Sequence, residues 1–209
     1  ISGGEGADTI VGGGGTDVIS PDSGADHITL GTGNADIVLA NEGNIKSTQD
    51  TVVGFNTGDE INIQATNAGE FGTLHRGDGA AFNGALAGNV ATVNIAGGAA
   101  DLAAAANNVI SINANTADLT IGYANIAALQ TAVDGAAITE NTNSTGFANG
   151  DELLIVWYNT TTTSYDVGII TIAGGNGFDG ADETYEALLA VDASGVTQAD
   201  VAASIDYIA

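Results

Sequence analysis

A β-branched aliphatic residue recurs at about every ninth position near the start of the chain. Between residues 3 and 39 the sequence repeats one nine-residue phrase four times, with an extra residue before the fourth copy. The eighth place is always aliphatic and holds Ile10, Ile19, Ile28 and Val38. In a short strand this residue points one way and its neighbours the other. Two phrases therefore make one coil, with Ile10 and Ile28 stacked on one wall and Ile19 and Val38 on the other.

Turn-forming residues precede each short strand. The fourth place of the phrase holds Gly6, Gly15, Gly24 and Asn34. Because Gly and Asn tolerate positive φ, six residues can fold back as a tight turn. The repeats therefore predict a narrow solenoid of parallel strands.

The apolar pattern after the repeats predicts short strands and a few short helices. Strands are expected at residues 90–95, 109–112 and 119–121, and the clearest pair is a hairpin of residues 153–158 and 167–172 that holds a buried Trp157. Helices are expected at residues 101–106, 125–133 and 183–190, and Thr197 is expected to cap another that runs on to residue 208. The predicted fold is all-β with few helices: a parallel β-roll over residues 1–53, then a β-rich, sandwich-like domain over residues 54–209.

Two later segments share the pattern of an aromatic residue, a turn ending in Gly-Asp-Glu, and an apolar run. They are residues 55–63 and 147–155. Either the two share a functional acidic turn, or both simply begin strands of one β-rich fold, which is the interpretation we favour.

The composition is strongly acidic. The 209 residues include 26 acidic and 2 basic side chains, for a formal charge of −24. This charge argues against nucleic acid or an anionic membrane surface as a partner. It also swells the chain by self-repulsion unless cations condense on it. There is no Cys, and no apolar run approaches the roughly 18 residues that span a bilayer. The chain opens at Ile1 without an initiator Met or signal peptide, so we expect a fragment or processed product.

An Asp fills the sixth place of every phrase. Stacking the coils puts Asp8 over Asp26 and Asp17 over Asp36, about 4.8 Å apart at the backbone. Two bare carboxylates at that separation repel by roughly 3 kcal/mol. A hard divalent cation, held by carboxylates and turn carbonyls, removes that cost. Calcium suits the region better than zinc or copper, because His27, expected to point outward, is its only soft-metal ligand.

These phrases resemble the RTX nonapeptide, the calcium-binding repeat G-G-x-G-x-D-x-U-x. The first two copies match at every defined place, and the last two depart at their opening glycines. The resemblance implies that carbonyls of the turns join the sixth-place Asp in binding Ca²⁺. Carried over, it implies two facing sets of ligands: Gly3, Glu5 and Asp8 with Asp22, Gly24 and Asp26, and Gly12, Gly14 and Asp17 with Thr32, Asn34 and Asp36.

Two further Asp residues are candidate calcium ligands outside the four copies. Asp50 begins a segment that resumes the Asp-x-Val spacing and ends in Phe55; in RTX proteins a similar segment closes the roll under an aromatic side chain. Asp179 ends a turn at residues 174–179 that repeats the first six places of the phrase, and Asp182 and Glu183 come directly after it. For residues 174–179 the sequence is equally consistent with an isolated calcium site and with a plain glycine turn.

No nucleophile, Walker-type or HExxH motif accompanies the two histidines, His27 and His75, so we expect no enzyme. The first hypothesis is a calcium-folded structural module of a secreted bacterial surface protein, exported unfolded by type I secretion and assembling with itself into an S-layer or similar lattice or filament. The alternatives are the secretion and folding module of a larger RTX enzyme or toxin, and the ligand-binding end of an adhesin. We expect no nucleic acid partner and no membrane insertion, with a surface polysaccharide as a possible ligand.

Overall fold

The computed structural model describes residues 1–39, 48–64, 90–94, 109–113, 122–135, 149–173 and 183–208. Strands dominate this part of the chain, which confirms the all-β class. The strands are β1 (Ser2–Glu5), β2 (Thr9–Val11), β3 (Val18–Ser23), β4 (His27–Thr29), β5 (Ile37–Leu39), β6 (Asp50–Val53), β7 (Glu60–Gln64), β8 (Val90–Asn94), β9 (Val109–Asn113), β10 (Glu152–Asn159), β11 (Ser164–Thr171), β12 (Thr184–Asp192) and β13 (Ile205–Ile208). The helices are α1 (Ile126–Gly135) and α2 (Gln198–Ala203).

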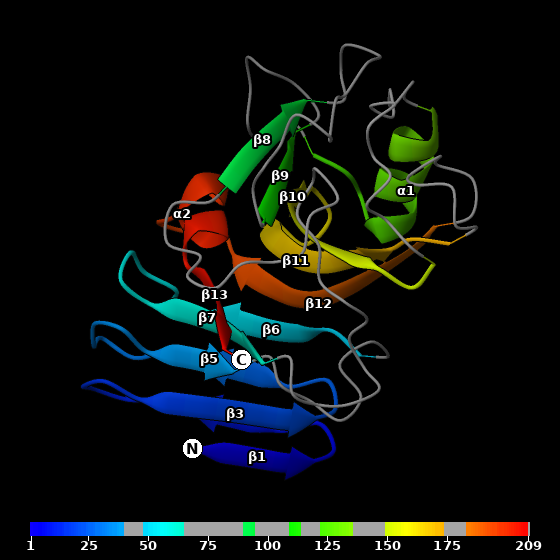
Figure 1. Ribbon diagram of the computed structural model, residues 1–209. Coiled ribbons are helices and arrows are strands. Elements are labelled where there is room, and N and C mark those ends of the chain that lie inside the picture. The colour runs from blue at the N-terminus through cyan, green and yellow to red at the C-terminus, as the bar shows by residue number, and fades with distance from the viewer. Residues whose placement is uncertain are drawn as a thin grey trace.

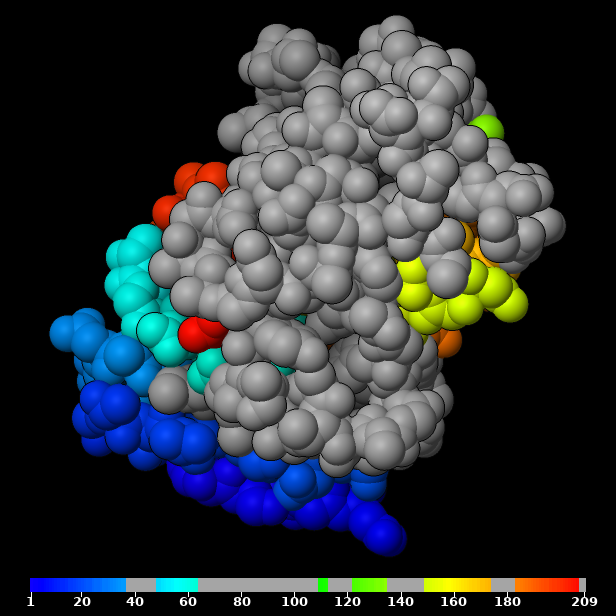
Figure 2. Space-filling view, viewed as in Figure 1, coloured from blue at the N-terminus to red at the C-terminus, as the bar shows by residue number. Residues whose placement is uncertain are grey.

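The repeats form the predicted parallel β-roll. Strands β1, β3, β5 and β7 pair in parallel along one wall, and β2, β4 and β6 along the other. Ile10 is in register with Ile28, and Ile19 with Val38, which confirms the two predicted walls. We call β1 to β7 the roll. Its first coils make one end of the molecule, with β1 outermost (Figures 1 and 2).

Both walls continue into strands from the far end of the sequence. β13 pairs in parallel with β7, with Ile205 opposite Ile61, and β12 pairs in parallel with β6, with Val191 opposite Val52. Beyond β12 the second sheet runs on through β11, β10, β9 and β8 (Figure 1). The division of the chain at residue 53 stays a prediction, and the backbone ladders join the roll to β12 and β13.

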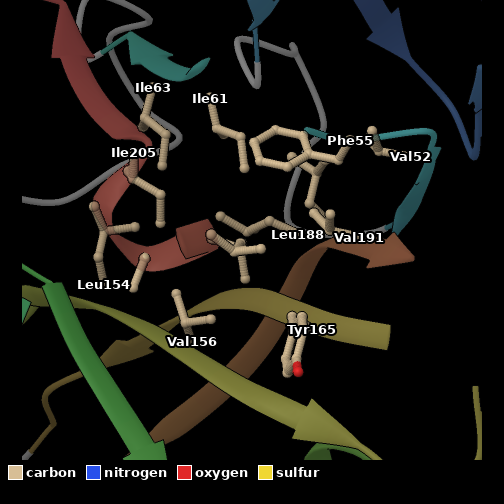
Figure 3. Close-up of a cluster of buried hydrophobic side chains, with 14 of the residues drawn as sticks. Val52, Phe55, Ile61, Ile63, Leu154, Val156, Tyr165, Leu188, Val191 and Ile205 are labelled. Carbon is tan, nitrogen blue, oxygen red and sulfur yellow. The ribbon is translucent and has the colours of Figure 1, made fainter. Parts of the chain in front are cut away.

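One hydrophobic core spans the end of the roll and the carboxyl-terminal strands. Phe55 is only 2% exposed, and Figure 3 shows it with Val52 and Ile61 facing residues of later strands. Those partners are Leu154, Val156, Tyr165, Leu188, Val191 and Ile205. Phe55 thus covers the roll's apolar interior where the repeats end.

The predicted hairpin is present and forms the middle of the second sheet. β10 and β11 pair antiparallel from Glu152 opposite Thr171 to Asn159 opposite Ser164. Trp157 is fully buried, as predicted, in a second cluster with Leu129 of α1. The predicted helix at residues 125–133 is confirmed as α1, and both Gly-Asp-Glu turns lead directly into strands, β7 and β10.

The helix predicted at residues 183–190 is wrong. These residues lie almost entirely in β12, which is paired on both sides, by β11 and by β6. Glu, Ala and Leu favour a helix locally, but a strand here buries Tyr185, Leu188 and Leu189 in the two cores.

The second carboxyl-terminal prediction is correct at its start and wrong at its end. Thr197 caps α2 in a capping box with Asp200, whose carboxylate also accepts the hydroxyl of Thr197 (2.7 Å). The helix then ends at Ala203, because the residues after it pair with β7 as β13. The strand predicted at residues 119–121 and the helix at 101–106 lie outside the described residues.

Gln198 fixes α2 against the second sheet. Its side-chain Nε2 lies within hydrogen-bonding distance of Ser111 Oγ (2.8 Å), Ile112 O (3.1 Å) and Val156 O (2.9 Å), and the residue is 2% exposed. Gln198→Ala leaves these buried acceptors without their donor. We expect it to lower the free energy of unfolding by about 1–3 kcal/mol in urea melts.

Gln130→Ala is the matched control for that substitution. Gln130 is half-buried, and among the described residues its Nε2 donates one long hydrogen bond, to the Glu183 carbonyl oxygen (3.4 Å). A loss of stability no larger in Gln198→Ala than in Gln130→Ala contradicts the anchoring role.

Candidate metal centre

Tight glycine turns place the sixth-place carboxylates between the two walls. Gly6 and Gly15 have φ of 110° and 112°, a conformation that glycine adopts without strain. The fourth copy differs, because its positive φ falls on Ala35 (63°) and Asn34 is not among the positive-φ residues. This is the turn that carries the extra Leu30.

The first ladder of carboxylates joins Asp8, Asp26 and Asp50. The backbone N–H of Asp8 donates to Oδ1 of Asp26 (2.7 Å), and the N–H of Asp26 donates to Oδ1 of Asp50 (2.8 Å). Asp26 and Asp50 are each only 2% exposed. The predicted stacking of Asp8 on Asp26 is therefore present, and Asp50 extends it by one coil.

A second, parallel ladder joins Asp17, Asp36 and Asp59. The N–H of Asp17 donates to Oδ1 of Asp36 (3.0 Å), and the N–H of Asp36 donates to Oδ1 of Asp59 (3.1 Å). From the sequence, Asp59 was placed in a turn before a strand and was not named as a calcium ligand. The signal for its second role is the spacing Asp59-x-Ile61, which matches the Asp-x-aliphatic spacing of the repeats.

Three of these carboxylates keep a buried oxygen that has no hydrogen-bond donor within the described part of the chain. The atoms are Oδ2 of Asp8, Oδ2 of Asp17 and Oδ2 of Asp26. A buried polar atom without a partner costs about 1–3 kcal/mol, and more when it carries charge. The protein alone leaves these charges uncompensated, and a cation bound to the oxygens compensates them.

The comparison with known families decides which cation this is. The family model of the RTX calcium-binding nonapeptide repeat (4 copies) matches residues 1–28. The chain carries RTX repeats. RTX nonapeptide repeats bind calcium, so Ca²⁺ is the cofactor of this region. Searches among curated proteins and among solved structures gave no match.

The atoms around Gly3 show whether the roll offers the kind of ligands that calcium prefers. A Cβ added at Gly3 would lie 2.4 Å from the Pro21 carbonyl oxygen and 3.2 Å from Asp8 Oδ2. A carbonyl and an unpartnered carboxylate oxygen thus both border a space that only glycine leaves open. Calcium prefers such a mixed set of oxygen ligands, so the residues fit it. Pro21 was not among the predicted ligands, although it fills the first place of the third repeat.

The carboxylates cannot form a complete site by themselves. In the described part of the chain, no group of three His, Cys, Asp or Glu side chains is placed to hold a metal. Backbone carbonyls must supply the remaining ligands, as the resemblance to RTX repeats implies. The same arrangement recurs at Asp17. A Cβ added to Gly12, the first residue of the second repeat, would lie 3.4 Å from the unpartnered Oδ2 of Asp17.

The side chain of Asp22 has a structural role. Its Oδ2 accepts hydrogen bonds from the hydroxyl of Ser2 and from the N–H of Gly4 (3.2 Å). Its Oδ1 accepts a hydrogen bond from the hydroxyl of Ser20 (2.9 Å). The Ser2 hydrogen bond does most to lower the pKa of Asp22, burial opposes it, and the bonds from Ser20 and Gly4 lower it further. Asp22 therefore ties β1 to β3, and the ligand expected from this residue is its carbonyl.

The remaining predicted ligands lie in or beside the turns at differing exposure. The Gly24 carbonyl accepts the hydroxyl of Thr48 (2.7 Å), and the Asn34 carbonyl accepts that of Thr16 (3.1 Å). Three other residues of the predicted set are exposed: Glu5 at the end of β1, and Gly14 and Thr32 in the turns. Their part in calcium binding stays a prediction.

His27 is exposed in β4, as its seventh place predicted. Asp179 lies outside the described residues, so the isolated calcium site near it also stays a prediction. No helix in the described part of the chain has the length and apolar character needed to cross a membrane.

Proposed function

We propose that this chain is a non-catalytic structural module of a bacterial cell-surface protein, which folds on calcium outside the cell and then assembles with copies of itself into an S-layer or similar array. The observation that carries the proposal is the set of unpartnered, buried oxygens on Asp8, Asp17 and Asp26. They make the fold of the first coils depend on calcium, and RTX repeats occur in secreted proteins.

The shared sheets support a role in which calcium binding affects the whole module. β6 and β7 of the roll are also neighbours of β12 and β13, and the core in Figure 3 lies between them. A roll held rigid by calcium is therefore a fixed base for strands β8 to β13. Such a base suits a protein that must present the same surface to each neighbour in a lattice.

The charge supports coupling between calcium and assembly. Two copies that each carry a net charge of −24 repel one another at low ionic strength. Bound calcium reduces that repulsion at the same step that completes the roll. Export of the unfolded chain, followed by folding in an extracellular medium near millimolar calcium, fits the weak affinity of extracellular calcium sites.

A calcium titration followed by both circular dichroism and light scattering tests this proposal. We expect the far-UV β signal to rise at roughly 10⁻⁴–10⁻³ M Ca²⁺ and the scattered intensity to rise with it or just above it. Mg²⁺ at equal concentration is the control, because its demand for octahedral geometry disfavours sites rich in carbonyl ligands. A chain that folds on calcium but stays monodisperse contradicts self-assembly and favours a folding and secretion module.

A further inference from the structure

The six stacked Asp residues are not equivalent in how their carboxylates are satisfied. Oδ2 is buried and unpartnered in Asp8, Asp17 and Asp26. In two others the protein itself supplies a donor: Asp36 Oδ2 accepts the N–H of Gly31 (3.0 Å), and Asp59 Oδ2 accepts the N–H of Asn56 (2.7 Å). Both carboxylates are buried, at 0% and 1% exposure.

The extra residue Leu30 explains the donor at Asp36. After β2, the N–H of Gly12 extends the ladder by donating to the Thr29 carbonyl (2.9 Å). In the next coil the same ladder position belongs to Leu30, whose N–H donates to the Val53 carbonyl (2.9 Å). The N–H of Gly31 is therefore not needed for the ladder and donates its hydrogen bond to Asp36 Oδ2 instead. The one-residue insertion therefore satisfies a carboxylate that the regular phrase leaves open.

The third repeat shows the opposite case. The residue five positions before Asp26 is Pro21, as Gly31 is five before Asp36. Proline has no N–H, so it cannot supply this donor. Asp26 Oδ2 accordingly stays unpartnered although the residue is only 2% exposed.

A closed turn explains the donor at Asp59. The N–H of Asn56 donates to Asp59 Oδ2, and the N–H of Asp59 donates back to the Asn56 carbonyl (3.1 Å). With the N–H of Asp36 on Oδ1 (3.1 Å), both oxygens of Asp59 are hydrogen-bonded. Backbone donors stabilise an ionised carboxylate as a nearby cation does.

We propose that calcium binds at Asp8, Asp17 and Asp26 and that Asp36 and Asp59 are metal-independent positions, where backbone N–H groups take the place of the ion. The roll is then built in two parts. β5, β6 and β7, next to the carboxyl-terminal strands, form without calcium, and the outer coils, residues 1–30, are added to them when calcium binds. This inference rests on calcium binding by the RTX repeats and is independent of self-assembly.

Metal counting on five single variants of the full chain tests the assignment. Asp8→Asn, Asp17→Asn and Asp26→Asn are each expected to lose one bound Ca²⁺ in native mass spectrometry, or to weaken one site at least tenfold in calorimetric titration. Asp36→Asn and Asp59→Asn are the matched controls, expected to keep the wild-type count while melting at lower temperature in EDTA. Loss of a calcium from either control, or the full count in Asp26→Asn, overturns the proposal.

Amide hydrogen exchange on the unmodified protein provides a test that no variant can spoil by misfolding. In EDTA we expect the amides of Gly31 and Asn56 to stay protected, while the amide of Asp8 exchanges at least tenfold faster than with calcium. Equal loss of protection at all three amides overturns the two-part roll. Light scattering of the same samples reports separately on self-assembly, so failure of one proposal is distinguishable from failure of the other.

Discussion

Removing calcium is expected to melt the outer coils of the roll while strands β8 to β12 stay folded. At 100 times its dissociation constant, a ligand that binds only the folded state stabilises that state by about 2.7 kcal/mol. Two such sites, one at Asp8 and Asp26 and one at Asp17, supply about 5.4 kcal/mol, which is comparable to the total stability of an ordinary domain, roughly 5–15 kcal/mol. Chelation also restores the mutual repulsion of the stacked carboxylates. The outer coils, residues 1–30, contain Asp8, Asp17 and Asp26 and should therefore unfold in EDTA.

Two signals separate the outer coils from the rest. Trp157 is the only Trp in the chain and lies fully buried in β10, so its emission reports on strands β8 to β12. We expect EDTA to reduce the far-UV β signal with little change in Trp157 emission. It should also expose the first 30 residues to a protease that cuts after acidic residues. Mg²⁺ added back should restore neither property, and Ca²⁺ should restore both. An unchanged cleavage pattern in EDTA would contradict the prediction that the outer coils need calcium to fold.

The roll could be predicted because its structure repeats in the sequence. A fixed nine-residue period sets the register of Ile10 on Ile28 and of Asp8 on Asp26, and the structure has both. Asp59 was missed because its turn, Gly54 to Gly58, keeps only one of the opening glycines. The hydrogen-bond donor at Asp36 was missed for another reason. In the sequence Leu30 is only an extra residue between two repeats. That it leaves the N–H of Gly31 available to Asp36 becomes visible only when the coils are stacked.

The carboxyl-terminal part was harder to predict, because its partners lie far away in the sequence. The hairpin of β10 and β11 is local and was found. The pairing of Val191 with Val52 joins residues that no local pattern connects. That pairing decides the structure of β12, although a helix was predicted at residues 183–190. Where long-range pairing buries a segment on both sides, local helix preference of a few tenths of a kcal/mol per residue is overridden.

A methyl group at Gly33 is expected to force two coils of the roll apart. A Cβ there would lie 1.6 Å from the Gly15 carbonyl oxygen and 2.6 Å from its carbonyl carbon, and both are backbone atoms held by the neighbouring coil. No rotamer relieves this contact, so the backbones must separate. Separation stretches the hydrogen bond from the N–H of Asp17 to Asp36 Oδ1 (3.0 Å) that lies beside it. We expect Gly33→Ala to lower the free energy of unfolding by about 3 kcal/mol, at the upper end of overpacking effects.

Gly14→Ala is the control that isolates the clash. Gly14 belongs to the neighbouring turn, has no atom within 4 Å of an added Cβ, and does not have a positive φ. Both substitutions reduce the entropy of the unfolded chain equally, which by itself stabilises by about 0.4–1 kcal/mol. Urea unfolding at saturating calcium should therefore show Gly14→Ala equal to or slightly above the wild type. Gly33→Ala should be far below it, with a calcium midpoint moved to higher concentration, because the coil carrying Asp17 no longer closes on the coil carrying Asp36. Equal stabilities for the two variants would mean that the coils do not stack at the separation described.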